Sequence, residues 1–241
     1  MITILGGGVA GAALAWALSR RGRRDVVVFD LLPAGSGSTT KAMGGFRTQH
    51  GNPLKIRLSL AARPWFEERA ERVHFQPHGY LYLADGEEAA VELGRRAEIQ
   101  KQCGLPISHP DPKSLVPFIE DGDLRGTNFC ALDGVYWPAE ILRCFIEEAQ
   151  ALGAQFRYGA EAGPGDLEAE AVVVCAGIWS RRVGEELGVE LKVDPLERGI
   201  FVAGPFDWLP ERVPMTLEVA SGYHFRERER RLLMTGPGDQ S

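Results

Sequence analysis

The chain opens with short apolar runs that alternate with segments of helical periodicity. Residues 2–5 and 25–29 are mostly β-branched and apolar, which predicts strands buried on both faces of a sheet. Residues 12–20 between them predict a helix, so a β-α-β unit is expected at the start. Further along, residues 155–158 and 171–175 predict two more short strands.

The middle of the chain predicts helices around one strand. Residues 53–72 are helical in pattern, with a kink or break expected at Pro64. Residues 79–83 alternate as a strand does, and residues 87–103 are rich in Ala, Glu and Arg at helical spacing. Residues 138–152 place their apolar side chains on one face, which predicts another helix.

The last part of the chain is dominated by strand-like segments. They lie at 196–202, 215–219, 223–226 and 232–235, and together they predict an antiparallel meander. Arg and Glu alternate in the cluster at 226–231, which we interpret as a solvated hairpin tip.

The order of the elements predicts an α/β protein. A chain of 241 residues accommodates one large domain or two small ones, and the interleaving favours two regions that share chain segments. A discontinuous Rossmann-like domain is expected from residues 1–75 and 138–190. A smaller α+β domain, built on an antiparallel sheet, is expected from residues 76–137 and 191–241.

Composition and charge exclude several classes of protein. A hydrophobic fraction of 44% with 25% charged residues is ordinary for a folded globular protein. The net charge of -6 has no basic block behind it, which argues against nucleic acid as a partner. No apolar run approaches the ~18 residues of a membrane span. A strand begins at residue 2 and leaves no room for a signal peptide, so a cytoplasmic location is expected.

No metal site is expected. The four cysteines lie far apart and form no C-x-x-C pair, so we interpret them as small buried hydrophobes. His74 and His78 have the i, i+4 spacing of a helical metal site, but Pro77 and Gly79 interrupt any helix there.

The strongest chemical signal is the sequence GGGVAG at residues 6–11, which fits the pattern G-x-G-x-x-G between a strand and a helix. Gly6 permits a tight turn, Gly8 lets the backbone approach a pyrophosphate, and Gly11 allows close helix packing. Asp30, at the end of the second strand, is expected to bind the adenosine ribose and thereby to disfavour NADP. A glycine-rich turn without a ligand is the alternative. The motif itself does not separate NAD from FAD.

A long loop follows the second strand. Residues 33–52 are polar and glycine-rich, and the connection is much longer than the ~2–6 residues usual in α/β units. Gly44 and Gly45 allow backbone N–H groups to approach a flat ring. The hydroxyl and cationic side chains that suit a pyrophosphate are Ser38, Thr39, Thr40, Lys41 and Arg47. A plain surface loop of similar composition is the alternative.

Residues 171–180 form an apolar strand that ends in Ala-Gly-Ile-Trp-Ser. With the motif at 6–11 and the loop at 35–47, this segment resembles the amine-oxidising flavoprotein family of D-amino acid oxidase, glycine oxidase, sarcosine oxidase and the L-proline dehydrogenase catalytic subunit. Further segments that carry the resemblance are 78–81, 151–154 and 221–226. The resemblance implies FAD as the cofactor. It also implies that residues 1–75 and 138–190 form the FAD-binding domain and that residues 76–137 and 191–241 form an incomplete substrate or cap domain.

The resemblance also implies which residues contact FAD. In the family, the loop after the second strand contacts the pyrophosphate and passes along the isoalloxazine, and a glycine turn matching Ala176 and Gly177 packs near the cofactor. Trp179 is a candidate contact, and a position in the core is the favoured alternative for it. The expected FAD contacts are Gly6, Gly8, Val9, Ala10, Gly11, Asp30, Leu31, Ser38, Thr39, Thr40, Lys41, Gly44, Gly45, Phe46, Ala176, Gly177 and Trp179.

The implied activity is that of an FAD-dependent oxidoreductase acting on a CH–NH or CH–NH2 donor. A small amine or amino acid would give a hydride from its α-carbon to flavin N5 and leave as an imine. Tyr223 matches the tyrosine that contacts the substrate carboxylate in the family, with a sheet tyrosine and a hydrated hydroxyl as the alternative. Arg47 and His50 are expected in the active-site cavity, which makes these three residues the catalytic candidates.

The chain is shorter than members of this family usually are. The portion that carries a basic residue for the substrate carboxylate is missing, so a second chain or a homo-oligomer is expected to complete the site. Two alternatives stay open. One is a non-catalytic flavin-binding subunit or fragment of a larger complex. The other is an NAD-dependent dehydrogenase, which leaves the long loop and the Ala-Gly-Ile-Trp-Ser turn unexplained.

Overall fold

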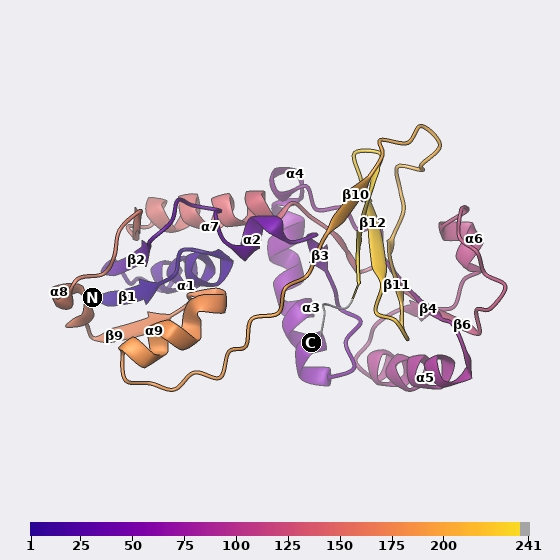
Figure 1. Ribbon diagram of the computed structural model, residues 1–241, viewed down its shortest axis with the longest axis horizontal. Coiled ribbons are helices and arrows are strands. Elements are labelled where there is room, and N and C mark those ends of the chain that lie inside the picture. Colours follow the sequence, from indigo (N-terminus) through magenta and orange to yellow (C-terminus); the bar gives the residue numbers. More distant parts are fainter. Residues whose placement is uncertain (237–241) are drawn as a thin grey trace. The chain divides into compact units, whose positions relative to one another are not determined.

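The computed structural model describes residues 1–236, which form two compact units (Figure 1). The first unit comprises Met1–Ala42 and Trp137–Pro195, and the second comprises Met43–Tyr136 and the chain from Leu196 onward. Both units are therefore discontinuous in sequence.

The first unit contains a parallel sheet with the strand order β8-β2-β1-β9. Its two central strands are almost wholly buried, and Ile2 lies between Val26 and Ala171 in the register. The β-branched, apolar composition of these strands suits a sheet covered on both faces, which confirms the predicted β-α-β unit. The strands are β1 (Ile2–Leu5), β2 (Val26–Asp30), β8 (Gln155–Tyr158) and β9 (Ala171–Val174).

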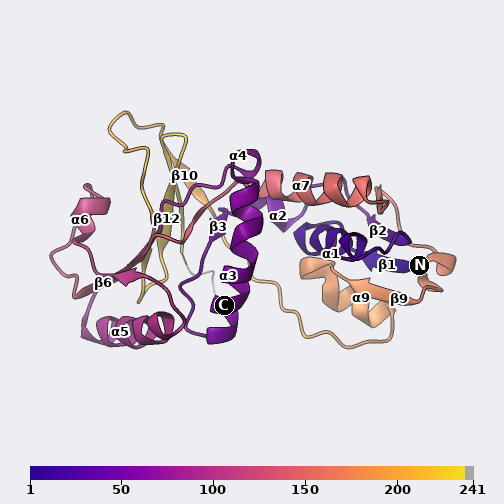
Figure 2. The same ribbon diagram turned by 180° about the vertical axis from the view of Figure 1, so that it is seen from behind.

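Two helices of the first unit, α1 and α7, lie side by side in both views (Figures 1 and 2). The buried face of α1 includes Gly11, Ala12 and Ala15, whose small side chains permit close packing. Trp16 Nε1 donates to Glu148 Oε2 at 2.8 Å and joins the two helices. The helices are α1 (Val9–Arg20), α2 (Ser38–Lys41), α7 (Pro138–Ala151), α8 (Pro164–Leu167) and α9 (Ser180–Glu186), with the 3-10 turn η1 (Gly177–Trp179).

The second unit contains, among the described residues, a seven-stranded sheet with the order β10-β13-β12-β11-β4-β6-β5. Neighbouring strands are antiparallel except β11 and β4, which are parallel. The meander predicted for the end of the chain is confirmed for β11, β12 and β13, whereas β10 joins the sheet beside β13 and not beside β11. The strands are β4 (Tyr80–Ala84), β5 (Ile107–Ser108), β6 (Gly126–Cys130), β10 (Phe201–Ala203), β11 (Met215–Glu218), β12 (His224–Arg228) and β13 (Arg231–Thr235).

The same unit has a small second sheet and several helices. β3 (Gly45–Phe46) pairs with β7 (Gly134–Val135). The helices are α3 (Pro53–Glu68), α4 (Ala70–Val73), α5 (Glu87–Gln102) and α6 (Pro112–Leu115). None of the helices within residues 1–236 combines the length and apolar composition needed to cross a bilayer.

Helix α3 does not break at Pro64. It continues through this residue to Glu68, and only there does the chain turn into α4. A proline removes one hydrogen bond from the helix interior. The burial of the following turn offsets this loss, because Phe66 packs against Phe46 and Phe75 with ring centroids 4.9 Å and 5.5 Å away.

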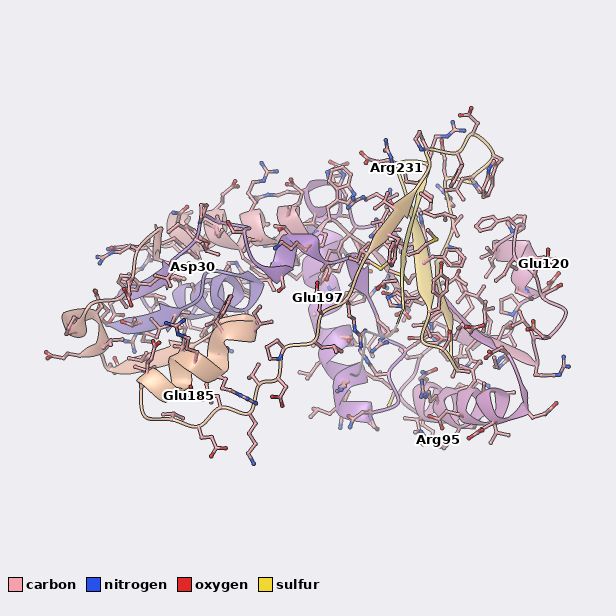
Figure 3. All side chains as sticks on the ribbon, viewed as in Figure 1. Asp30, Arg95, Glu120, Glu185, Glu197 and Arg231 are labelled. Atoms are coloured by element: carbon pink, nitrogen blue, oxygen red, sulfur yellow. The ribbon has the colours of Figure 1, made fainter. Side chains whose placement is uncertain are left out.

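The hairpin between β12 and β13 corrects the prediction for the charged cluster. Its tip is at Glu229 and Arg230, which both have positive φ, and the tip lies at the outer end of the sheet near Arg231 (Figure 3). Arg226, however, is not solvated, since only 1% of it is exposed. Strand alternation turns this side chain toward the core face. The predicted strand at 196–202 is also shorter than expected, because regular pairing begins at Phe201.

The predicted boundary at residue 75 differs from the boundary that contacts define. Residues 43–75 belong by contacts to the second unit. The physical reason is that β3 pairs with β7 and that Phe46 packs against Phe66 and Phe75. The predicted FAD-binding and substrate domains are functional assignments, and these stay a prediction.

The cysteines lie in or near the cores. Cys130 and Cys144 are buried, as the sequence predicts, whereas Cys103 and Cys175 are partly exposed. All four are free thiols.

Candidate functional site

The turn between β1 and α1 requires glycine at two of the three predicted positions, Gly6 and Gly11. Gly6 has φ 111°, and a Cβ there would overlap the backbone carbonyl of Cys175. A Cβ on Gly11 would overlap the carbonyl oxygen of Gly6. At Gly8 the nearest atom to an added Cβ is Thr39 Oγ1 at 3.2 Å. The turn thus forms a cradle without side chains, as a pyrophosphate-binding loop needs.

Asp30 is fixed beside this cradle at the end of β2 (Figure 3). Its Oδ2 accepts from the Gly7 N–H at 2.8 Å, and its Oδ1 accepts from the Leu32 N–H at 2.9 Å. Each oxygen keeps a further lone pair, which is what two ribose hydroxyls would use. The arrangement fits the predicted ribose contact.

Tyr158 completes the cradle and is a residue that sequence analysis missed. Its hydroxyl donates to the Gly7 carbonyl at 2.9 Å, and its ring lies against Gly7. Burial and the charge of Asp30 raise the pKa of Tyr158 to about 12, so the hydroxyl keeps its proton at neutral pH. The only available signal was a tyrosine at the end of a predicted strand.

The N-terminus of α1 points its first amides at the same place. Val9 and Ala10 are exposed, and the first N–H groups of a helix have no partner within it. Thr39 Oγ1 accepts from the Val9 N–H at 3.1 Å, since the N-cap Gly8 has no side chain to do so. Thr40 instead donates its hydroxyl to Gly35. A helix N-terminus of this kind favours an anion such as a pyrophosphate.

The turn after β9 borders the cradle. Ala176 Cα lies 2.8 Å from the position of a Cβ on Gly6, and Gly177 has φ 57°. Trp179 is 60% exposed, so its favoured interpretation as a core residue is wrong. It is the last residue of η1, the short 3-10 turn that follows β9, and its ring is exposed there. Leu31, at 67%, is also exposed, which leaves two apolar side chains available to a ligand.

Ser38 and Lys41 in the predicted flavin loop are exposed, and the loop then enters the second unit. There Gly44 has φ 78°, and a Cβ on Gly45 would overlap the Tyr80 hydroxyl. Phe46 is only 5% exposed because it packs among aromatic rings. Any contact from Phe46 to a ligand would therefore come from its backbone.

Arg47 and His50 are brought together in the second unit. Arg47 Nη1 donates to the Tyr82 hydroxyl and Nη2 donates to His50 Nδ1, both at 3.2 Å. No carboxylate forms an ion pair with Arg47 within residues 1–236. Burial lowers the pKa of His50, and the charge of Arg47 adds to this effect. A cation whose contacts are neutral groups is a candidate anion site.

The tyrosines near this pair were not predicted. Tyr80 and Tyr82 are buried on β4 with ring centroids 6.4 Å apart. Burial raises the pKa of both hydroxyls, so both stay protonated at neutral pH. The alternation of the strand predicted one buried face, but not that the hydroxyls would point toward Gly45 and Arg47.

The third catalytic candidate is placed differently. Tyr223 lies one residue before β12 and is 41% exposed, and its N–H donates to Ser221 Oγ at 3.0 Å. Burial raises the pKa of its hydroxyl. In the described part of the chain no hydrogen bond joins Tyr223 to Arg47 or His50. Its role in a site therefore stays a prediction.

A glycine cradle, an acidic residue at the end of β2 and a helix N-terminus define the class of dinucleotide-binding proteins of Rossmann type. The family model described as DAO, FAD dependent oxidoreductase, matches residues 1–241. The chain belongs to this family, whose cofactor is FAD. The match decides between FAD and NAD in favour of FAD.

Several curated relatives are amine or amino acid oxidases or dehydrogenases. Glycine oxidase of Geobacillus kaustophilus (strain HTA426) is 27% identical over 225 residues, which cover 81% of this chain and 59% of that protein. Mitochondrial sarcosine dehydrogenase of Mus musculus is 25% identical over 218 residues, which cover 79% of this chain and 24% of that protein. The chain thus spans less than two thirds of the length of the first relative and about a quarter of the length of the second.

Solved structures share the fold. The L-proline dehydrogenase of P.horikoshii has a TM-score of 0.85 and 22% identity, covering 98% of this chain and 68% of that chain. The glycine oxidase of Geobacillus kaustophilus has a TM-score of 0.83 and 24% identity, covering 99% of this chain and 71% of that chain. The predicted α/β fold class is therefore confirmed.

Proposed function

We propose that this chain binds FAD and oxidises a small amine or amino acid. The observation that carries the proposal is the cradle at Gly6, Gly8 and Gly11 with Asp30 held against Gly7. These groups suit the ADP half of FAD, with the amide of Ala10 facing the pyrophosphate and the Asp30 carboxylate facing the ribose. The Val9 amide is held by Thr39 Oγ1 beside it. The remaining predicted FAD contacts belong to the same proposal.

The second unit supplies groups that suit the substrate. Arg47 would hold a substrate carboxylate through its planar fork, because its hydrogen-bond partners, Tyr82 and His50, are neutral groups and no carboxylate within residues 1–236 forms an ion pair with it. The guanidinium has no acceptor, so Nδ1 of His50 must accept from it and the ring proton is on Nε2. His50 therefore orients Arg47 while this bond exists, and it does not serve as a base through Nδ1.

The chemistry that FAD supplies when bound is acceptance of a hydride from the α-carbon of the amine. The side chains of the chain then have three tasks, which are to orient the amine, to exclude water and to keep the cation of Arg47 in place. The buried hydroxyls of Tyr80 and Tyr82 stay protonated at neutral pH, so they do not act as bases, and the Tyr82 hydroxyl accepts from Arg47. Tyr223 is proposed as a further contact to the substrate carboxylate.

The test is the visible absorption spectrum of the purified chain before and after addition of FAD, and then of glycine, sarcosine or proline. Flavin bands that bleach with one of these amines are the expected result. The matched control is Asp30→Ala, which removes the proposed ribose contact and should weaken FAD uptake. Absence of flavin uptake by the parent chain would refute the proposal.

A non-catalytic role is the second candidate. The pyruvate dehydrogenase phosphatase regulatory subunit of Mus musculus, a mitochondrial protein, is 22% identical over 261 residues that cover 98% of this chain. Similarity to a protein named as a regulatory subunit supports the proposal that this chain binds flavin without catalysing a reaction. Flavin bands that form but do not respond to any amine would favour this candidate.

Partner and compartment complete the proposal. The relatives extend beyond the part that this chain matches, and a second chain or a second copy is proposed to supply what the site lacks. Sedimentation of the FAD-loaded protein over a range of concentrations tests this. The cytoplasmic location is likewise proposed, and fractionation of cells with detection of the native chain tests it.

A further inference from the structure

A buried cation in the second unit is bound to main-chain carbonyls. Arg226 on β12 is 1% exposed, and its Nη1 donates to the carbonyls of Met43, Gly44 and Tyr136 at 2.8, 2.7 and 3.2 Å. No carboxylate in residues 1–236 forms an ion pair with it. Burial lowers the pKa of Arg226 to about 10, so the guanidinium is still charged at neutral pH.

A buried anion lies at the other end of the same segment. Asp133 is 0% exposed, and its Oδ1 accepts from the N–H and the hydroxyl of Thr48. Its Oδ2 accepts from Gln49 Nε2 at 3.0 Å. Thr48 and Gln49 are themselves buried.

The two charges share the segment Met43–Gln49 and do not pair with each other. A buried charge costs free energy unless fixed dipoles compensate it. Such a group therefore restricts the positions of the groups that are hydrogen-bonded to it. The cation takes carbonyls at the start of the segment, and the anion takes donors at its end. The residues between them are Gly45, Phe46 and Arg47.

We propose that Arg226 and Asp133 are positioning residues that clamp the segment Met43–Gln49 from its two ends. The clamp fixes the left-handed turn at Gly44, and with it the direction of the Gly45 backbone. It also fixes the base of the Arg47 side chain, whose head contacts Tyr82 and His50. This inference rests on the proposed function, in which the same segment faces the flavin and the substrate carboxylate.

Neither residue needs to touch a ligand for this role. Phe46 is anchored separately by aromatic packing, so the clamp matters most at the two flanking positions, Gly45 and Arg47. The clamp therefore predicts effects that are local to the segment. Replacement of a residue with a merely structural role in the core would instead destabilise the whole sheet.

The experiment is hydrogen exchange of backbone amides, read by mass spectrometry, on the full chain without added FAD. The variants are Arg226→Met, Arg226→Lys and Asp133→Asn, and the control is Arg231→Met at the hairpin. We expect the peptide covering 43–49 to exchange about tenfold faster or more in Arg226→Met and Asp133→Asn, since each leaves buried groups unpaired. Arg226→Lys should show a smaller increase, because it keeps the charge but not the fork.

Strand β4 serves as the internal reference, because its ladder should keep the exchange rate of the parent chain. Unchanged exchange at 43–49, or an equal increase at 43–49 and in β4, would overturn the clamp. If Arg226→Met does not fold, the other two variants still test the clamp. Asp133→Asn tests the end of the segment at Thr48 and Gln49, and Arg226→Lys tests the end at Met43 and Gly44 with the positive charge retained.

A second readout separates positioning from stability. In FAD-loaded protein, Asp133→Asn should raise the KM for amines that carry a carboxylate about tenfold and leave kcat and the KM for amines without one nearly unchanged. An equal rise for both kinds of amine contradicts positioning through Arg47. If the parent chain takes up no flavin, the proposed function fails, whereas the exchange experiment still decides on the clamp.

Discussion

The two units build their candidate sites by opposite means. In the first unit the site is made by the absence of side chains, because a Cβ on Gly6 or Gly11 would overlap neighbouring backbone. In the second unit the site is made of long polar side chains, with Arg47 held by Tyr82 and His50. We therefore expect the first site to be disturbed by added side-chain atoms and the second site to be disturbed by the loss of a hydrogen bond.

The difference also concerns charge. Asp30 in the first unit is partly exposed, and its carboxylate receives backbone N–H groups. Asp133 and Arg226 in the second unit are buried and depend on a few dipoles for compensation. We therefore expect the cradle to respond to steric changes and the second site to respond to charge and pH.

The largest effect should come from Gly11→Ala. The added Cβ overlaps the Gly6 carbonyl, so the turn must move, at a cost of about 3 kcal/mol. We expect a fall in Tm of about 6–12 °C and loss of FAD binding. Thermal unfolding and flavin titration measure the two effects.

The matched control is Gly165→Ala in α8 of the same unit. An added Cβ there meets nothing within 4 Å, and the backbone is helical. We expect a change of at most about 1 kcal/mol. Equal effects of the two substitutions would show that the cradle is not defined by the absence of side chains.

Replacement of Arg47 tests the other unit. Arg47→Met removes the cation that lacks an acidic partner, and we expect a carboxylate-containing amine to bind about 100-fold more weakly. Arg47→Lys should recover part of this loss, because it restores charge without the planar fork. Spectral titration of the FAD-loaded protein gives the dissociation constants.

Arg57→Met on helix α3 is the control for this prediction, because Arg57 is exposed. It should leave the binding of the same amine within about twofold of the parent value. A similar loss of affinity in both arginine variants would indicate a general effect of net charge. Arg47 would then not be a specific carboxylate site, and the contrast drawn between the two units would be wrong.

The same contrast explains what the sequence could predict. The cradle is local, since one motif, one strand end and one helix start lie within residues 2–30, and the pattern predicted all of them. The contact of Tyr158 with the cradle was not predicted, because Tyr158 lies on β8. Neither the β2 nor the β8 segment shows by its own sequence that the two strands pair. The exposure of Trp179 likewise depends on how the chain turns after β9.

The second site depends on residues far apart in the chain. Arg226 donates to Gly44, which lies 182 positions earlier, and Thr48 bonds to Asp133, 85 positions later. The charged cluster at 226–231 predicted a solvated turn because local composition does not reveal which strand face is buried. Pairing between strands, and not local pattern, places these charges.

A smaller effect is expected from Tyr158→Phe. The substitution keeps the ring against Gly7 and removes only the hydroxyl that donates to the Gly7 carbonyl. We expect a loss of about 1 kcal/mol, a fall in Tm of about 2–4 °C and FAD binding weakened about fivefold. Tyr158→Leu, which also removes the ring, should cost more. No loss in Tyr158→Phe together with a loss in Tyr158→Leu would assign the effect to packing of the ring and not to the hydroxyl.

The smallest effect should be a pH dependence that belongs to the second unit. Burial, and then the charge of Arg47, lowers the pKa of His50 below its ordinary 6.5. Between pH 6.5 and the lower folded-state pKa, the unfolded chain binds a proton that the folded chain does not, so stability falls as the pH falls through this window. His78 also has a lowered pKa, from burial and then the charges of Arg212 and Arg226, and it contributes in the same direction.

His50→Gln removes one of these two contributions. The Tm of the variant should therefore fall less than that of the parent chain between pH 7.5 and about 5.5. His78→Gln should remove the other share, and the double variant should show the flattest profile. A profile that is unchanged in His50→Gln would mean that His50 takes up its proton equally in both states, and the contact with Arg47 would then not keep the imidazole neutral.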